Sequence, residues 1–120
     1  MGTKIIVRNY YTHAPIYSHE REENTLQKTI DCAIEDGVSL DCAAIYGPVK
    51  IVGQKIKTAV IVDAQLEHCE LIGCDIVNGT VEKSLMIRNL LDDCALTECK
   101  MALNRYGAHC TLLYCEEVKL

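Results

Sequence analysis

The 120-residue sequence contains no tryptophan, no phenylalanine and only two prolines. With so few large aromatic side chains, aliphatic residues have to fill the core, and this favours a narrow core. No stretch is long and apolar enough to span a bilayer, and the N-terminus lacks the basic region, apolar run and cleavage site of a secretory signal. We therefore expect a single cytoplasmic domain, 1–120, without a membrane segment.

Catalytic and cofactor motifs are also missing from the sequence. The four histidines are dispersed, and no serine or cysteine nucleophile motif accompanies them. There is no glycine-rich phosphate loop, and none of the eight cysteines belongs to a Cys-x-x-Cys pair. We expect no enzymatic activity, no cofactor and no metal site.

A repeat with a period of five is the main positive feature. A large aliphatic residue occupies every fifth position in the second half of the chain, and we call this set the large column: Ile51, Ile56, Ile61, Leu66, Leu71, Ile76, Val81, Met86, Leu91, Leu96 and Met101. Neither an amphipathic helix nor an alternating strand keeps such a column on one face. The period instead predicts a short extended segment followed by a turn in each unit.

A second column precedes the first by two residues and is mostly small, and we call it the small column: Val49, Gln54, Ala59, Ala64, Cys69, Cys74, Gly79, Ser84, Asn89, Cys94 and Cys99. Both columns point inward if the chain winds into a coil. Four units would close a square coil of about 20 residues, with successive coils stacked at the β-sheet spacing of about 4.8 Å.

The segment CELIGCDIVNGTVEKSLMIRNLLDDCALTECKM, residues 69–101, resembles the pentapeptide-repeat family, whose motif is a small residue, a polar residue, leucine and two variable residues. The resemblance covers roughly residues 38–101, with one extra residue near Gly47 and Pro48 that shifts the register. It implies an all-β fold, a right-handed quadrilateral parallel β-helix. The coils would occupy 38–103 and be followed by a C-terminal cap or dimerisation strand over 104–120.

One helix is expected ahead of the coils, within an N-terminal segment, 1–37, that also holds a strand and a loop. The sequence predicts a strand over Lys4 to Arg8 and a tyrosine-rich loop after it. In the helix, Asn24 would cap the N-terminus and Gly37 would end it. Its apolar stripe would close the open end of the solenoid. The lead-in from this helix into DGVSLDCAAIYG also resembles short phage and prophage members of the family.

Four of the eight cysteines fall in the small column, where a thiol behaves as a compact hydrophobic group. We expect them to be reduced. A square coil of four units would stack Cys74 on Cys94, so an oxidised pair remains an alternative.

Acidic side chains are concentrated in the later part of the chain. Residues 1–62 carry seven acidic and seven basic side chains, whereas residues 63–103 carry eight and three. In a coil of four units Lys50 would lie beneath Glu70, and Lys55 beneath Asp75. Asp92, Asp93 and Glu98 would lie above uncharged residues. The candidate partner-binding residues are therefore the acids of these faces: Asp92, Asp93, Glu98, Glu70 and Asp75.

An acidic rod can imitate the phosphate backbone of DNA. Pentapeptide-repeat proteins that protect gyrase from quinolones are understood as such mimics, and the resemblance implies a phage-encoded decoy for a host DNA-binding protein. Gyrase, a restriction enzyme or a CRISPR effector would be its target. The alternative is an assembly module without DNA mimicry, which includes a homodimer through the C-terminal strand. The net charge of −5 argues against direct binding of nucleic acid.

Overall fold

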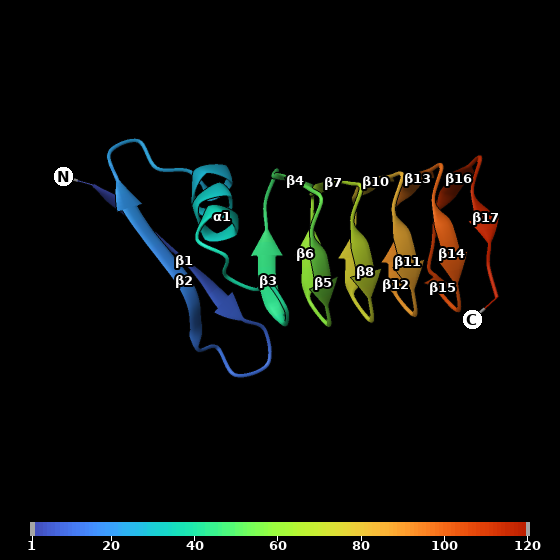
Figure 1. Cartoon of the computed structure of the whole chain (residues 1–120), viewed down its shortest axis with the longest axis horizontal. Helices are drawn as coiled ribbons and strands as arrows, with labels where there is room; N and C mark the ends of the chain where they lie inside the picture. Colours follow the sequence, from blue (N-terminus) through green and yellow to red (C-terminus); the bar gives the residue numbers. More distant parts are fainter. Residues whose placement is uncertain (1, 120) are drawn as a thin grey trace.

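The structure is a computed structural model that describes residues 2–119, and these residues form a rod of stacked coils (Figure 1). Its Cα atoms span 48 × 25 × 25 Å. Two strands and a helix stand at one end: β1 (Thr3–Asn9), β2 (Pro15–Arg21) and α1 (Leu26–Glu35). The predicted β-solenoid with a single helix near the N-terminus is thus confirmed. Within the described part of the chain, no helix has the length and apolar character needed to cross a membrane.

Fifteen short strands build about five coils. In chain order they are β3 (Ala43–Tyr46), β4 (Lys50–Val52), β5 (Lys55–Lys57), β6 (Val60–Val62), β7 (Gln65–Glu67), β8 (Glu70–Ile72), β9 (Asp75–Val77), β10 (Thr80–Glu82), β11 (Leu85–Ile87), β12 (Leu90–Asp92), β13 (Ala95–Thr97), β14 (Lys100–Ala102), β15 (Arg105–Tyr106), β16 (Thr111–Leu113) and β17 (Glu116–Glu117).

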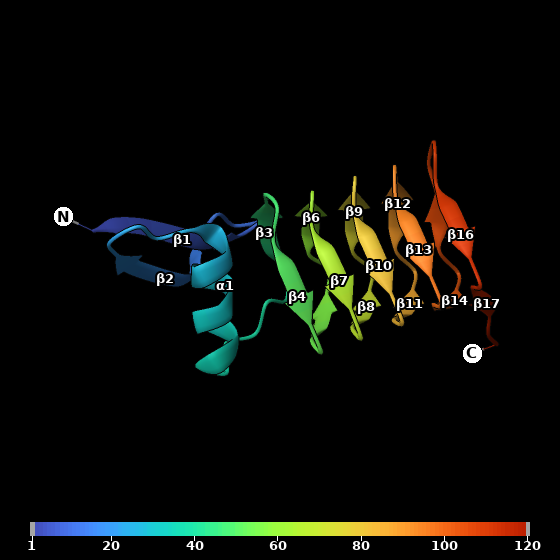
Figure 2. The same cartoon turned by 90° about the horizontal axis from the view of Figure 1, so that it is seen from above.

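The coil has three sides, not the predicted four. Among β3 to β17 every third strand pairs in parallel, which gives a second sheet β16-β13-β10-β7-β4 and a third sheet β17-β14-β11-β8-β5. The first sheet, β15-β12-β9-β6-β3-β1-β2, is extended by the antiparallel strands β1 and β2. Figure 2 shows the second sheet along the rod, with α1 at its β4 end. Val60 pairs with Asp75 and Asp75 with Leu90, so one coil contains three of the repeat units. The prediction failed because a period of five fits coils of three and of four units equally well.

Both columns point inward as predicted. Every member of the large column is buried, and so is every member of the small column except the half-buried Gln54. The corners between strands depend on one residue in the left-handed region, with φ from 50° to 64° at Asp63, His68, Asn78, Lys83, Arg88, Asp93 and Glu98. Left-handed backbone turns the chain sharply. Each unit is therefore an extended segment of three residues, then one corner residue and one inward small residue.

Buried polar residues of the small column replace missing backbone partners. The Asn89 side chain accepts a hydrogen bond from the Cys74 backbone N–H (2.8 Å) and donates one to the Leu71 carbonyl (2.9 Å). The Ser84 hydroxyl accepts from the Cys69 N–H at 3.1 Å. No buried side-chain nitrogen or oxygen of the described residues lacks a partner. Asparagine and serine are therefore tolerated in the dry core, because each side chain accepts a hydrogen bond from a buried backbone N–H of the preceding coil.

Helix α1 closes the first coil, as expected, but its boundaries differ slightly from the prediction. Thr25, not Asn24, is the N-cap, and its hydroxyl accepts from the Lys28 N–H at 3.2 Å. The Asn24 amide instead donates to the carbonyls of Thr3 and His19, which fixes the helix to the strands before it. Gly37, with φ 72°, follows the helix end as predicted.

The apolar stripe of the helix faces the core. Ile30 and Ala33 are fully buried, while Leu26 and Ile34 are half-buried against the same cluster.

Part of the predicted tyrosine-rich loop is a second strand: Tyr17 lies in β2, whereas Tyr10 and Tyr11 lie in the turn between β1 and β2. β1 and β2 form an antiparallel hairpin, and β1 also pairs with β3, where Arg8 lies opposite Ala44. The hairpin therefore extends the first sheet beyond the coils. The strand over Lys4 to Arg8 was predicted from its own residues, whereas β2 depends on pairing with the preceding strand, β1.

Side chains close the other two strand edges of the first coil. The Gln27 carboxamide accepts from the Lys50 N–H (2.6 Å) and donates to the Lys50 carbonyl (2.9 Å) on the edge of β4. On β5, the Asp41 carboxylate accepts from the Lys57 N–H at 2.9 Å, and the Lys57 carbonyl accepts from the Cys42 N–H at 2.9 Å. All three sheets thus have a partner at this end of the rod.

The predicted one-residue shift near Gly47 and Pro48 is confirmed, because Ala44 pairs with Val60, one position beyond three full units. A second shift was missed, since Ala95 pairs with Thr111, which is again one position beyond three units. After this shift the chain forms two strands, β16 and β17, that continue the coil in parallel with β13 and β14. The expected single terminal strand is therefore a further turn of the solenoid.

Candidate functional site

The five predicted acidic residues lie outside the core on different sides of the rod. Asp75 and Asp92 belong to strands β9 and β12 of the first sheet, and Glu70 belongs to β8 of the third sheet. Asp93 and Glu98 occupy left-handed corners at the two borders of the second sheet. The three-sided coil therefore does not gather all five residues on one surface.

The shorter coil changes the predicted charge pairs. Lys55, not Lys50, is the neighbour of Glu70, and its Nζ lies 3.8 Å from Glu70 Oε2. Lys50 instead pairs with Glu67, with 3.5 Å between Nζ and Oε2. These ion pairs are exposed, and such pairs contribute about 0 to 1 kcal/mol each. Glu70 is thus partly neutralised.

Asp75 also has neighbours other than those predicted. It lies between Val60 and Leu90 in the first sheet, so it is not above Lys55. Two arginines, Arg88 and Arg105, line the same shallow depression as Asp75. Asp75 therefore lies beside basic side chains and is not part of a surface that is acidic throughout.

Asp92, Asp93 and Glu98 follow different residues from those predicted. Asp92 pairs with Val77 in the preceding coil, so Asp93 follows Asn78 at the same corner. Glu98 follows Lys83, because Thr97 pairs with Glu82. Of these three acids, only Asp92 and Asp93 therefore lie above uncharged side chains.

A different acidic surface covers the second sheet and its borders. We call it the acidic side, and it consists of Asp63, Glu67, Glu82, Asp92, Asp93 and Glu98. Glu67 and Glu82 are direct neighbours in adjacent strands, a placement in which like charges repel. The second sheet and its borders therefore carry a ladder of acidic side chains, and Lys50 beside Glu67 and Lys83 beneath Glu98 are basic residues of the same surface.

At the border between the first and second sheets, the acidic residues occupy the same corner position in different coils. Asp63, Asn78 and Asp93 occupy this corner in successive coils, and the Asn78 amide donates to Asp63 Oδ1 at 2.5 Å. Asp63, Glu67 and Glu82 were absent from the predicted set. Comparing residues that lie three repeat units apart in the sequence, instead of four, would have identified them.

Cysteines of the small column are buried as predicted, and all eight cysteines of the chain are free. Cys74 lies next to Asn89, so the stacking of Cys74 on Cys94 was wrong. Burial raises the pKa of Cys74 to about 11, and it raises the pKa of Cys69, Cys94 and Cys99 as well. These thiols remain protonated at neutral pH and so lack the thiolate that reacts or binds metal.

No metal centre is formed by histidine, cysteine and acidic side chains within residues 2–119.

The Tyr17 hydroxyl donates to Asp36 Oδ2 at 2.6 Å, and this hydrogen bond, with some desolvation, raises the pKa of Tyr17 to about 12. Tyr17 therefore holds β2 against the end of α1.

Comparisons with known proteins add no relative: no protein-family model matches the chain, and a search of curated proteins found no match. The regular repeat of three units per coil in a β-solenoid is compatible with pentapeptide-repeat proteins.

Proposed function

We propose that this protein is a non-enzymatic, phage-encoded decoy that binds a host DNA-binding protein through the acidic side. Gyrase, a restriction enzyme and a CRISPR effector are the candidate targets, and the cytoplasm of the host cell is the expected location. The observation that carries the proposal is the acidic ladder on the second sheet and its borders.

The charge density of the later coils supports this proposal. Residues 63–103 have a net charge of −5 from eight acidic and three basic side chains. At three units per coil and a sheet spacing of about 4.8 Å, this part of the chain occupies about 13 Å of the rod axis. Counted over all three sheets, this is one net negative charge per about 2.6 Å of the rod axis, against about 1.7 Å in duplex DNA.

The rigidity of the surface also suits a decoy. The corner residues are fixed by backbone hydrogen bonds between coils, such as Asp93 N–H to the Ala108 carbonyl at 2.9 Å. Carboxylates held on such a frame lose little entropy when they meet a basic channel.

A displacement experiment tests the proposal. The protein is used to capture binding partners from a bacterial host lysate and is then washed with excess duplex DNA. A decoy requires that DNA elutes the captured protein and that capture weakens as salt rises, because both ligands compete for one basic channel.

Matched charge reversals locate the contact. Replacing Asp63, Asp92 and Asp93 with lysine should abolish capture, since all three are surface residues of the acidic side. The control reverses Glu20, Glu22 and Glu35, which are exposed in the N-terminal part and give the same change in net charge. Equal loss with both sets, or capture that excess DNA leaves intact, would reject the decoy.

One observation favours the alternative of an assembly module. Leu112, Leu113 and Tyr114 of the last coil are exposed, and such apolar clusters suit protein contacts. A homodimer through β16 would bury them and would leave the protein indifferent to DNA. Sedimentation over a range of concentrations, with Leu113→Glu as the disrupting variant, distinguishes this module from the decoy.

A further inference from the structure

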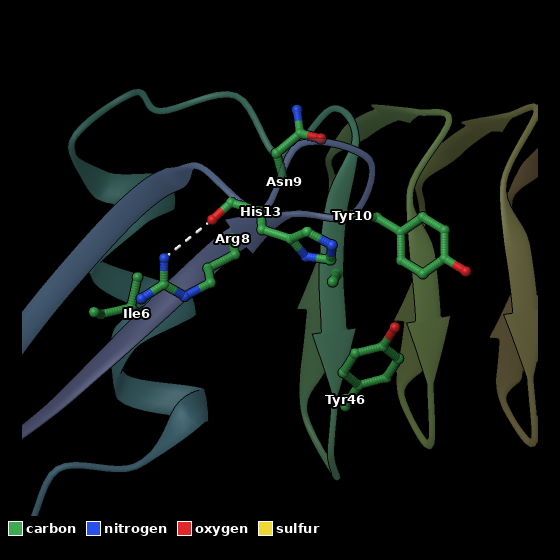
Figure 3. Close-up of a pocket in the computed structure, with 7 residues that line it drawn as sticks. Ile6, Arg8, Asn9, Tyr10, His13 and Tyr46 are labelled. Carbon is green, nitrogen blue, oxygen red and sulfur yellow. Dashed lines mark hydrogen bonds between the residues drawn. The ribbon is translucent and has the colours of Figure 1, made fainter.

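A second surface feature lies at the opposite end of the rod from the last coil, between the hairpin turn and the first sheet. It is a hollow of about 250 Å³ lined mainly by Ile6, Arg8, Tyr10, His13, Ala44 and Tyr46. Figure 3 shows Ile6 and Arg8 on one side, Tyr10 and Tyr46 on the other, and the His13 ring between them. The volume suits a ligand somewhat smaller than a typical drug-sized molecule.

Sheet pairing explains why the hollow exists. Arg8 of β1 lies opposite Ala44 of β3, so both side chains leave the same face of the first sheet. The alanine side chain fills little of the space beneath the guanidinium. The hairpin register also shifts beside Arg8, where Ile16 of β2 is left without a partner between Val7 and Arg8 of β1, as at a β-bulge.

The turn over the hollow is fixed before any ligand arrives. Asn9 Oδ1 accepts from the backbone N–H groups of Tyr11 (2.8 Å) and Thr12 (3.1 Å). The Tyr10 N–H donates to the Cys42 carbonyl at 2.7 Å, and the Tyr11 hydroxyl donates to the Thr58 carbonyl at 3.0 Å. These bonds tie the turn to the coils, so little entropy is lost when a ligand binds.

The lining of the hollow is mainly apolar with a small number of hydrogen-bond donors, and it includes no carboxylate, although the protein carries a net charge of −5. Arg8 Nη1 donates to the His13 carbonyl at 3.0 Å, which holds the guanidinium in place. Among the described residues, Arg8 forms no ion pair, and the hydroxyls of Tyr10 and Tyr46 make no hydrogen bond. An anion is therefore the complementary charge.

The lining also offers two phenol rings. Tyr46 is 55% exposed and Tyr10 is 42% exposed, which leaves both rings accessible to a flat partner. The Arg8 guanidinium matches the acceptor oxygens of a phosphate group, and the two phenol rings match the face of an aromatic ring. An isolated phosphate would leave the rings unused, and an isolated ring would leave the donors unused.

We propose that this hollow binds a small ligand in which a planar ring carries a phosphate group. Arg8 binds the phosphate, and Tyr10 and Tyr46 contact the ring. This site is independent of the acidic side and does not depend on the decoy proposal.

Four probes dissect the two parts of the ligand. Adenosine monophosphate and phenyl phosphate contain a ring and a phosphate, adenosine contains the ring alone, and inorganic phosphate contains the anion alone. Because the chain has six tyrosines and no tryptophan, tyrosine fluorescence and the NMR signals of Arg8, Tyr10 and Tyr46 report binding. We expect the two-part probes to bind at roughly 0.1–1 mM and each single-part probe at least about tenfold more weakly.

Two variants and one control locate the site. Arg8→Met keeps the aliphatic stem and should weaken binding of both phosphate probes about tenfold or more, the loss expected for a charged hydrogen bond. Tyr46→Ser changes an exposed side chain without disturbing the core and should remove the advantage of phenyl phosphate over inorganic phosphate. Arg105→Met, at the other end of the same sheet, should bind like the parent.

Three results would overturn the proposal. They are no saturable binding of adenosine monophosphate or phenyl phosphate below about 10 mM, equal weakening by Arg8→Met and Arg105→Met, and unchanged binding of phenyl phosphate to folded Tyr46→Ser.

Discussion

The first and last coils of the rod use the same repeat unit, but their inward side chains are covered to different degrees. At the first coil, β1, Gln27 and Asp41 supply partners for the three strand edges, and Ile45 and Ile51 are fully buried. In the last coil, the corresponding large positions hold Tyr106 and Leu112, and both are exposed. Burial in a solenoid therefore comes from the neighbouring coil, as expected for quasi-one-dimensional proteins.

The largest effect should come from placing a charge in the large column. Leu96 and Leu112 are direct neighbours in adjacent coils, yet they are 1% and 46% exposed. Leu96→Lys should unfold the protein because an unpaired charge would enter the dry core, at a cost comparable to a total stability of about 5–15 kcal/mol. Leu112→Lys should cost less than about 1 kcal/mol, as is usual for a surface substitution.

Circular dichroism and urea unfolding of the two variants give this comparison directly. Similar stability losses at both positions would show that the last coil is as dry as the interior.

The next effect concerns the dependence of stability on pH through the buried thiols. The pKa of Cys74 is about 11 in the folded protein, against 9.0 as its ordinary value, so the folded state retains the proton more tightly. Its contribution to stability is complete below pH 9 and is lost as the pH rises from 9 to 11. The free energy of unfolding should fall there by up to about 1.4 kcal/mol per pH unit for this group.

Urea unfolding between pH 8 and 11 measures the slope, and Cys74→Ala should reduce it by the share of this one thiol while Cys69, Cys94 and Cys99 keep theirs. A Cys74→Ala protein with the parent's slope would assign the pH dependence to other groups.

The smallest effect should follow from opening one edge of the first coil. Gln27→Ala removes both hydrogen bonds to the Lys50 backbone and should cost about 1–2 kcal/mol. Hydrogen exchange of the Lys50 amide should accelerate, while the Gln65 amide of the next coil remains protected.

Gln65→Ala serves as the matched control, since the Gln65 side chain is exposed on the second sheet. If exchange at Lys50 is unchanged in Gln27→Ala, helix packing alone closes this end of the rod.

Local features of the fold were predicted well from the sequence. The two inward columns, the helix with its Ile30 and Ala33 stripe and the extra residue at Gly47 and Pro48 all appear in the structure. Each of these depends on residues close together in the chain, where side-chain size and backbone preference decide the conformation.

Predictions that needed a contact between coils were less successful. The neighbours of Glu70, Asp75 and Glu98 were assigned with a coil of four units, and all three assignments were wrong. Strand β2 was missed because it is stabilised by pairing with β1 and not by its own pattern.

The sequence by itself determined which residues point inward, because a period of five places one large and one small side chain of every unit on the same side of an extended segment. Only the tertiary structure decided how many units close a coil. The angle at each corner results from a left-handed residue together with packing across the whole cross-section, and the period of five is the same for three sides and for four. Because three units close a coil, each residue lies beside the residue three units away in the sequence, and not beside the one four units away. The number of units per coil therefore decides which charged side chains are neighbours along the acidic side.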